Sequence, residues 1–222
     1  MKLGSAVSSE VQGGAHRHLL LPLGSTEQHG PHLPLDTDAR IADAIAVAAG
    51  ERLVAAVAPV VPYGASGEHA SFAGTLSIGT EVLRAVIVEL VRSAALTFSS
   101  MTLVNGHGGN HPALIDAVDQ MRAEGHAVSG WWPTLSGDAH AGRTETSLML
   151  AIAPDEVRLD RAEPGNVSPV AELMADMREG GVAAVAPNGV LGDPTGASAA
   201  EGRVMLAALV DDLVATVESR DC

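Results

Sequence analysis

The chain of 222 residues has few cysteines, few aromatic residues and few basic residues. Its single cysteine, Cys222, excludes an intrachain disulfide and is typical of proteins in a reducing cytosol. Aromatic residues make up 2% of the chain, so the core must be built from Ala, Val, Leu and Ile. Lys and Arg number 13 against 27 acidic residues, and the net charge of −14 argues against nucleic acid and membrane surfaces as partners.

Long apolar runs are also lacking. No stretch of about 18 apolar residues is present, so we expect no transmembrane helix. Residues 1–10 contain one Lys and no apolar core, which does not fit a signal peptide. A hydrophobic fraction of 46% with 18% charged residues is typical of a globular protein. We therefore expect one cytoplasmic domain over residues 1–222, with residues 1–18 as an N-terminal extension that carries no recognisable motif.

Short apolar segments alternate with helical patterns along the chain. Residues 18–24 form a continuous apolar run that stops at glycine, which is typical of a strand buried on both faces. The predicted strands are 18–24, 54–61, 101–104 and 127–132; the predicted helices are 39–53, 80–95, 111–123, 145–152 and 199–219; and 63–79 is a predicted loop. This alternation predicts an α/β fold of three layers, α/β/α, with a mainly parallel central sheet covered on both faces.

Histidines gather where such a fold binds its ligands. In parallel sheets, ligands lie beyond the carboxyl ends of the strands. Six of the nine histidines lie in or beside the polar loops of the sequence: His29, His32, His69, His107, His111 and His140. These loops are therefore the place to look for chemistry.

The segment GSTEQHGPHLPLDTD (residues 24–38) follows the first predicted strand. In an extended segment Glu27 and His29 project to the same side, where they can bind one metal ion or two adjacent ions. Asp38 lies at the start of the next helix, a position that the helix dipole also favours for a carboxylate. The alternative is a polar loop with a helix cap, and we prefer that interpretation for Asp36.

The segment NGHGGN (residues 105–110) follows the third predicted strand. It lacks the spacing and the Lys of a phosphate-binding P-loop. His107, at the carboxyl end of a central strand, is directed to the same region as Glu27 and is a predicted ligand, with a structural turn histidine as the alternative. We expect Asn110 to cap the following helix and His111 to lie on the surface.

A third segment, residues 138–147, precedes a short apolar helix. Glu145 opens this helix without forming a capping box, so we interpret it as a ligand, with a simple first-turn acid as the alternative. His140, five residues earlier, is a candidate acid–base group, with an orienting role beside the site as the alternative.

Together these segments supply three carboxylates and two imidazoles: Glu27, His29, Asp38, His107 and Glu145. Mixed oxygen and nitrogen donors suit Zn²⁺, Mn²⁺ or Fe²⁺. Five ligands exceed what one catalytic ion needs, so we expect two divalent ions per subunit bridged by Asp38.

The three segments, in this order, resemble the creatininase family of metal-dependent amidohydrolases over nearly the whole chain. The loop YGASGEHASFAGTLS (residues 63–77) is similar to the family's loop beside the active site, which makes Glu68 and His69 candidates for shaping the pocket. The resemblance implies a creatininase-like fold and a dinuclear site. It places one ion on Glu27 and His107, the other on His29, and Asp38 on both.

The chain departs from the creatinine-hydrolysing members of the family at two positions. They have a Glu where this chain has Gly109, and Glu145 is the obvious supplier of the missing carboxylate. They have a Trp where this chain has Ser136, which argues against creatinine as the substrate. Trp131 or Trp132 could cover the substrate instead, although buried strand positions are the alternative.

The resemblance is greatest to a peptidase branch of the family, as residues 180–185 and 189–195 further indicate. It implies a homo-oligomer that acts on a modified precursor peptide. A radical-SAM enzyme has crosslinked the terminal Val and Tyr of this peptide, and hydrolysis ahead of the Val releases an intermediate of a redox cofactor. The alternatives are an amidohydrolase for a cyclic amide or formamide, or a metal-binding scaffold without catalysis.

Overall fold

The computed structural model describes residues 1–12, 17–134 and 137–219, so Ser136 and Cys222 lie outside the described residues. Its sheet has four parallel strands in the order β2-β1-β3-β4. The strands are β1 (His18–Leu23), β2 (Ala56–Val57), β3 (Ser100–Asn105) and β4 (Val128–Trp131). The predicted parallel sheet is confirmed.

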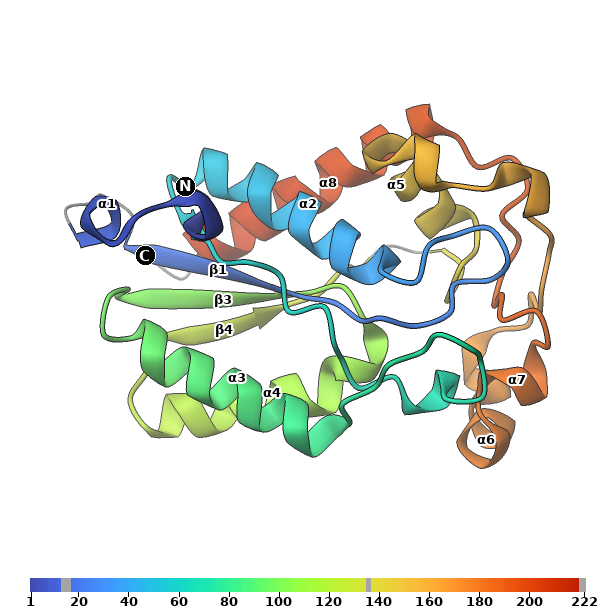
Figure 1. Ribbon diagram of the computed structural model, residues 1–222, viewed down its shortest axis with the longest axis horizontal. Coiled ribbons are helices and arrows are strands. Elements are labelled where there is room, and N and C mark those ends of the chain that lie inside the picture. The colour runs from blue at the N-terminus through green and yellow to red at the C-terminus, as the bar shows by residue number, and fades with distance from the viewer. Residues whose placement is uncertain (13–16, 135–136, 220–222) are drawn as a thin grey trace.

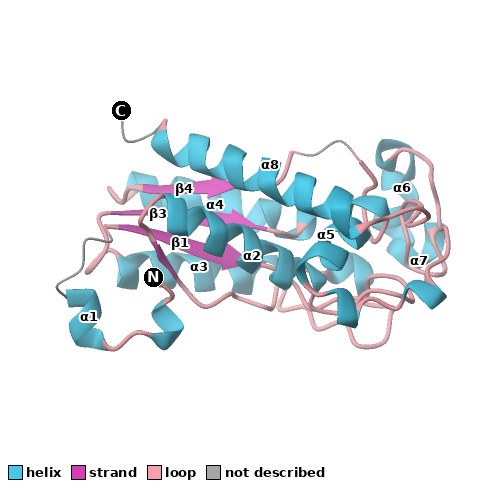
Figure 2. Cartoon of the chain, turned by 90° about the horizontal axis from the view of Figure 1, so that it is seen from above, coloured by secondary structure: helices cyan, strands magenta, loops and turns pink. Residues whose placement is uncertain are grey.

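Helices cover both faces of the sheet (Figures 1 and 2). One face carries α2 (Thr37–Arg52) and α8 (Ala199–Glu218), and α5 (Arg143–Ile152) packs against both helices beyond the ends of the strands. The other carries α3 (Thr80–Ala94) and α4 (His111–Ala123). The three predicted layers are therefore present. None of the described helices is both long and apolar enough to span a membrane.

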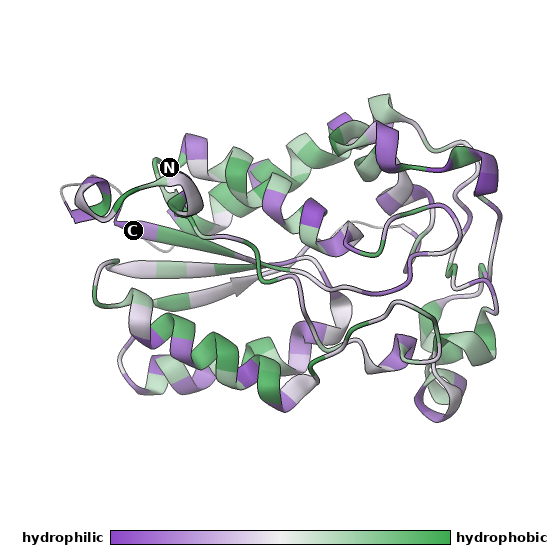
Figure 3. Ribbon diagram, in the orientation of Figure 1, coloured by the Kyte–Doolittle hydropathy of each residue, from purple (hydrophilic) through white to green (hydrophobic). Residues whose placement is uncertain are grey.

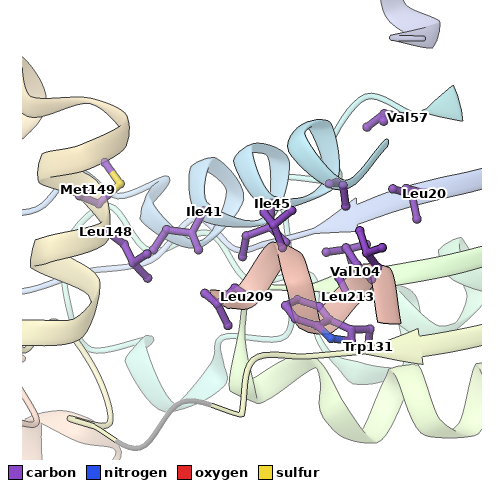
Figure 4. Packing of buried hydrophobic residues seen from close by; sticks show 14 of the residues in the cluster. Leu20, Ile41, Ile45, Val57, Val104, Trp131, Leu148, Met149, Leu209 and Leu213 are labelled. Carbon is purple, nitrogen blue, oxygen red and sulfur yellow. The ribbon is translucent and has the colours of Figure 1, made fainter. Parts of the chain in front are cut away.

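Side chains of successive strand residues enter two separate cores. Leu20 points toward α2 and α8, where it joins Ile45 and Leu213 (Figure 4). Leu21 points to the opposite face and packs with residues of α3 such as Leu83. Each fully buried Leu contributes about 1.5–3 kcal/mol relative to an exposed one. Figure 3 shows the contrast between apolar β1 and the largely hydrophilic loop that follows it.

The predicted strand over residues 54–61 is wrong in extent. Only Ala56 and Val57 pair with β1 as a strand, and a single bridge joins Leu23 to Val61 further along. Val54 has a positive φ of 52°, so the chain turns there before it reaches the sheet. Pro59 lies within the predicted run and cannot donate a ladder hydrogen bond.

The N-terminal segment packs against this short edge strand. It forms a 3-10 turn, η1 (Leu3–Ser5), and a short helix, α1 (Ser8–Gln12). The terminal amine of Met1 donates to the Ala55 carbonyl at 3.0 Å. Lys2 also bridges to Val57.

Residues 153–198, for which the sequence patterns predict no element, form a lobe beyond the carboxyl ends of the strands (Figure 1). Its elements are η4 (Pro154–Glu156), η5 (Leu159–Arg161), α6 (Val170–Gly180) and α7 (Val182–Val185). Leu173, Val182, Ala186 and Leu191 form its small buried core, which also contacts Phe72. Phe72 follows the turn η2 (Gly67–His69) in the long loop before α3. The lobe and this loop therefore lie together at the end of the sheet where ligands bind.

Candidate metal centre

Two glycines let the ends of β1 and β3 approach the start of α2. A Cβ atom on Gly24 would lie 2.4 Å from the amide nitrogen of Ala39, and one on Gly106 would lie 2.6 Å from the Asp38 carbonyl oxygen. Side chains larger than hydrogen cannot fit there without a shift of the backbone. These contacts bring the residues that follow both strands against Asp38.

Asp38 lies at the centre of the cluster, with 2% of its surface exposed. Its Oδ1 is 3.0 Å from His29 Nε2 and its Oδ2 is 3.1 Å from His107 Nδ1. The Ser25 hydroxyl donates to Oδ2 at 2.8 Å. Although burial opposes ionisation, His29 and His107 hold the pKa of Asp38 well below its usual range. Asp38 is therefore an ionised carboxylate placed between two imidazoles.

Glu27 is fully buried, and neither of its carboxylate oxygens has a hydrogen-bond partner among the described residues. His107 Nε2 lies 3.2 Å from Oε2, and His69 Nε2 lies 3.3 Å from Oε1. Burial and the nearby Asp38 raise the pKa of Glu27 to about 7. A buried carboxylate without partners is costly, so this site calls for a cation.

The two imidazoles beside Asp38 are held with their nitrogens facing carboxylates. His29 Nδ1 donates to the Glu27 carbonyl at 3.1 Å, which leaves Nε2 facing Asp38. Burial lowers the pKa of His29, but Asp38 outweighs it and raises the pKa to about 10. In the same way burial is outweighed at His107, chiefly by its hydrogen bond with Asp38, and its pKa rises to about 9. Either a proton or a metal ion must therefore lie between each imidazole and its carboxylates.

Glu145 completes the set of donors from the first turn of α5. Its Oε2 accepts a hydrogen bond from the Ala141 amide at 2.6 Å and lies 3.9 Å from His29 Nε2. Three groups of donor atoms lie within 4.8 Å of one another: Glu27, Asp38 and His107; His29, Asp38 and Glu145; and Glu27, His29 and His140. Asp38 is common to the first two groups. The structure thus brings all five predicted ligands together.

His140 joins this cluster through contacts that sequence analysis did not foresee. Its Nε2 is 2.8 Å from the Gln28 carbonyl, and its ring centroid is 4.3 Å from that of His29 and 4.5 Å from that of His69. The Gln28 side chain also lies in the cluster, 2.8 Å from His69 Nδ1. The sequence contains no signal for this role of Gln28, because a strict alternation would point it away from its neighbours.

The predictions for three neighbouring residues need correction. Asn110 makes no capping hydrogen bond. Its Oδ1 accepts from the Ala65 amide at 2.9 Å, and its Nδ2 donates to the Gly24 carbonyl and to Asn105 Oδ1, both at 3.0 Å. Asp36 occupies the N-cap position of α2, but its carboxylate accepts from Arg40 at 2.7 Å and not from the helix. His111 is half-buried rather than on the surface.

The two tryptophans have different environments. Trp131 is buried on the α8 side of the sheet and its indole donates to Asp212 at 2.7 Å. Trp132 packs partly in the other core, and its ring centroid lies 4.9 Å from that of His111. Trp131 is therefore a core residue, and only Trp132 is available to contact a ligand.

Two cavities open onto the donor cluster. The larger, of about 800 Å³, is lined by Glu27, His107 and His140 on one side and by the lobe residues Met174 and Met177 on the other. A smaller cavity of about 200 Å³ is lined by residues that include His107, Glu145 and Trp132. The arrangement combines buried charged donors with an apolar wall across the larger cavity, as is common in ligand-binding sites.

Comparison with known proteins defines the class. The family model described as "Creatininase: Creatinine amidohydrolase" matches residues 7–217. The chain therefore belongs to the creatininase family, and the predicted resemblance is confirmed. It is 53% identical to the mycofactocin precursor peptide peptidase of Mycobacterium tuberculosis, over 97% of this chain and 90% of that protein. It is 54% identical to the protein of the same name from Mycolicibacterium smegmatis, over 94% of this chain and 87% of that protein.

Solved structures of creatininase share the fold. The structure described as "Creatininase Mn" has a TM-score of 0.85 and 25% sequence identity, and the alignment covers 99% of this chain and 98% of that one. A mutant creatininase described as "Zn-Zn type" aligns with a TM-score of 0.83, 25% identity and coverage of 99% and 97%. These relatives carry manganese or zinc by description.

Proposed function

We propose that this chain is a dinuclear metallopeptidase that hydrolyses a modified precursor peptide near its C-terminus during mycofactocin biosynthesis. The observation that carries the metal site is Glu27, a fully buried carboxylate whose oxygens have no hydrogen-bond partner among the described residues. The peptide substrate rests on the likeness to mycofactocin precursor peptide peptidases, at 52–54% identity.

Two ions fit the donors better than one. Glu27, Asp38 and His107 would hold the first, and His29, Asp38 and Glu145 the second, so that Asp38 bridges them. Zn²⁺, Mn²⁺ and Fe²⁺ all accept this mixture of carboxylate and imidazole. Ser25, through its hydrogen bond to Asp38, would fix the orientation of the bridging carboxylate.

Bound divalent ions would polarise a peptide carbonyl and lower the pKa of a water molecule. The residues of the chain supply the rest. His140 is buried within the cluster, and its Nδ1 lies 3.8 Å from Glu27 Oε1. Nδ1 would take the proton of the attacking water and pass it to the amine nitrogen as the C–N bond breaks. Overall one water is consumed, and the products are a carboxylate and an amine.

The larger cavity supports a substrate of peptide size. Its volume of about 800 Å³ and its wall of Met174 and Met177 suit a bulky apolar group beside the cleaved bond. The crosslinked Val-Tyr unit of the modified precursor peptide has this character. Hydrolysis ahead of the Val would release that unit with a free amine.

Incubation of the metal-loaded protein with the radical-SAM-modified precursor peptide tests this function by mass spectrometry. We expect loss of the terminal crosslinked Val-Tyr unit, and suppression of this loss by a chelator. The unmodified precursor peptide serves as the control substrate. Absence of cleavage by a protein that demonstrably holds metal would contradict the peptidase proposal and leave the metal site standing.

A second candidate is an amidohydrolase for a cyclic amide or formamide. The creatinine amidohydrolase of Pseudomonas putida is 30% identical over 64% of this chain and 67% of that protein. Presenting creatinine, a formamide and the modified peptide in parallel separates the two functions, because only one class should be turned over efficiently. Bound metal without turnover of any of them would instead indicate a non-catalytic scaffold.

We also propose a cytoplasmic homo-oligomer, in line with the single cysteine and with the family resemblance. Size-exclusion chromatography with light scattering on the metal-loaded protein measures the subunit number. A monomeric mass across the working concentration range would contradict the oligomer.

A further inference from the structure

The side-chain amide of Gln28 has an orientation fixed by two backbone groups. Oε1 accepts from the Gly30 amide at 2.8 Å, and Nε2 donates to the Gly189 carbonyl at 3.0 Å. If the two amide atoms were exchanged, the Gln28 NH₂ group would face the Gly30 N–H, and the Gln28 amide oxygen would face the Gly189 carbonyl oxygen. Neither pair could form a hydrogen bond. Because a backbone N–H only donates and a carbonyl only accepts, the positions of Oε1 and Nε2 are unambiguous.

This orientation determines the tautomer of His69. Gln28 Nε2, which carries two hydrogens and no lone pair for accepting, lies 2.8 Å from His69 Nδ1. Nδ1 must therefore accept, and the ring proton resides on Nε2. That nitrogen lies 3.3 Å from Glu27 Oε1. His69 thus turns a proton, and not a lone pair, toward Glu27.

The backbone of the same residue determines the tautomer of His140. His140 Nε2 lies 2.8 Å from the Gln28 carbonyl, which can only accept, so Nε2 carries the proton. The contact of 3.1 Å between this nitrogen and Gln28 Nε2 is then one between two donors and not a hydrogen bond. The two hydrogens of the Gln28 amide are accounted for by Gly189 and His69. The unprotonated Nδ1 of His140 lies 3.8 Å from Glu27 Oε1.

We propose that Gln28 is a positioning residue that holds His69 and His140 in the same Nε2–H tautomer, so that the two rings present opposite atoms to Glu27. His69 turns its N–H toward Glu27 and His140 turns a lone pair, while the Glu27 oxygens accept no hydrogen bond among the described residues. Of the two, only His140 can bind a cation or take a proton at the cluster without first changing its tautomer. All three residues are buried, with at most 8% of their surface exposed.

Gly189 is adapted to this arrangement. It has a positive φ of 81°, and a Cβ atom there would lie 1.8 Å from Gln28 Oε1. An alanine at this position would displace the Gln28 amide from both histidines. The place of Gln28 between the rings is therefore supported from the lobe side of the site as well as from its own loop.

The consequence for catalysis rests on the proposed function. His140, with a free Nδ1 and with Nε2 anchored on a carbonyl, would serve first as proton acceptor and then as proton donor. His69 would keep its proton on Nε2, 3.3 Å from Glu27 Oε1, where the N–H dipole favours the charge on that carboxylate. The tautomers themselves do not depend on which substrate is cleaved.

Two-bond ¹H–¹⁵N correlation spectra of the zinc-loaded full chain, labelled with ¹⁵N-histidine, report which ring nitrogen carries the proton. His69→Gln and His140→Gln spectra assign the two rings. We expect both rings as the Nε2–H tautomer at neutral pH. Observation of His69 as the Nδ1–H tautomer, or of His140 with a protonated Nδ1, would overturn the proposal whether or not the peptide is cleaved.

Substitution of Gln28 should then change the tautomer of His69 but not that of His140. In Gln28→Glu the amide that faces His69 Nδ1 becomes an acceptor, so His69 should change to the Nδ1–H tautomer. Met has a similar volume to Gln but no amide that donates to His69 Nδ1, so in Gln28→Met His69 should show both tautomers. His140 should remain Nε2–H in both variants, because its partner is the backbone carbonyl. Gln120→Met, which removes an amide on α4, is the matched control and should change neither ring.

An unchanged His69 spectrum in folded Gln28→Glu and Gln28→Met would contradict the role of Gln28. If Gln28→Glu fails to fold, the native protein and Gln28→Met decide the question. For Gln28→Met we further expect metal content to be retained and hydrolysis of the modified peptide to fall by about 10–100-fold, as for other partners that orient site groups. Unaltered hydrolysis with a changed His69 tautomer would show that the tautomer is set as inferred but does not limit the reaction.

Discussion

The donor cluster at the ends of β1 and β3 and the lobe that contains α6 and α7 face each other across the larger cavity, but different contacts stabilise them. The donor cluster is buried except for the partly exposed Glu145, and it is held by close backbone approaches at Gly24 and Gly106. The lobe has a buried core of four apolar residues and an otherwise largely exposed α6. We infer that the first region sets the chemistry and that the second, which is less constrained, sets the choice of substrate.

The largest effect should come from breaking the donor cluster at Glu27. In Glu27→Gln we expect hydrolysis to fall by at least about 10³-fold, well beyond the 10–100-fold loss typical of an orienting partner. The metal content measured by mass spectrometry should fall as well. The metal-free variant should unfold at a higher temperature than the metal-free native protein, because a buried carboxylate without a hydrogen-bond partner among the described residues is removed.

Glu179→Gln is the control for Glu27→Gln. Glu179 lines the same cavity from α6 but is exposed. Glu179→Gln should leave the metal content and the melting temperature unchanged. Full metal content in Glu27→Gln would rule out Glu27 as a ligand.

The backbone approach that builds the cluster can be tested by Gly106→Ala. The new Cβ would meet the Asp38 carbonyl oxygen at 2.6 Å, so the loop must move. We expect a loss of about 1–3 kcal/mol in the free energy of unfolding, measured by urea denaturation, and weaker metal binding. Gly108→Ala, two residues away, is the matched control, since its Cβ would meet nothing within 4 Å. Equal stability of the two variants would show that close approach at residue 106 does not matter.

These two regions also differ in how far the sequence predicts them. That the five proposed ligands lie together could be predicted, because each lies within a few residues of a strand end or a helix start, where local patterns are informative. The contacts of Gln28 with His69, His140 and Gly189 could not be predicted, because they span 41, 112 and 161 residues of sequence. Local spacing contains no information about such contacts.

The missed helix α6 is a different case. Val170, Leu173, Met174 and Met177 recur at helical spacing, so a signal was present in the sequence. The strand predicted after α2 was too long, because the whole apolar run was taken as a strand without regard to Pro59. The parallel sheet and its two helical layers could be predicted, since short apolar runs alternate regularly with segments of helical spacing.

A smaller effect is expected from the lobe. Met174→Ala removes part of the apolar wall of the cavity but no donor atom. We expect KM for the modified peptide to rise about fivefold, equivalent to about 1 kcal/mol, with kcat and metal content unchanged. Glu172→Ala, an exposed change on the same helix, should alter neither parameter. A fall in kcat alone for Met174→Ala would contradict the division of roles between the two regions.

The remaining effect is confined to acid pH and concerns the stability that His32, in contact with Thr146, contributes. This residue is fully buried, its Nε2 lies 2.8 Å from the Thr146 hydroxyl, and its Nδ1 has no hydrogen-bond partner in the described part of the chain. Burial, with a smaller contribution from His29, lowers the pKa of His32 from 6.5 to about 4. The unfolded chain therefore binds a proton below pH 6.5 that the folded chain does not bind until about pH 4.

His32 should accordingly contribute a stability that is fully present above about pH 6.5 and is lost as the pH falls toward 4, by up to about 3 kcal/mol. In His32→Gln this part of the pH dependence should disappear, although the variant is less stable at pH 7.5 because the packing of the buried ring is lost. Urea denaturation from pH 4.5 to 7.5 measures the difference between the two proteins. If their free energies of unfolding stay parallel over this range, His32 is not the group responsible, and the acid sensitivity of the fold lies in the donor cluster itself.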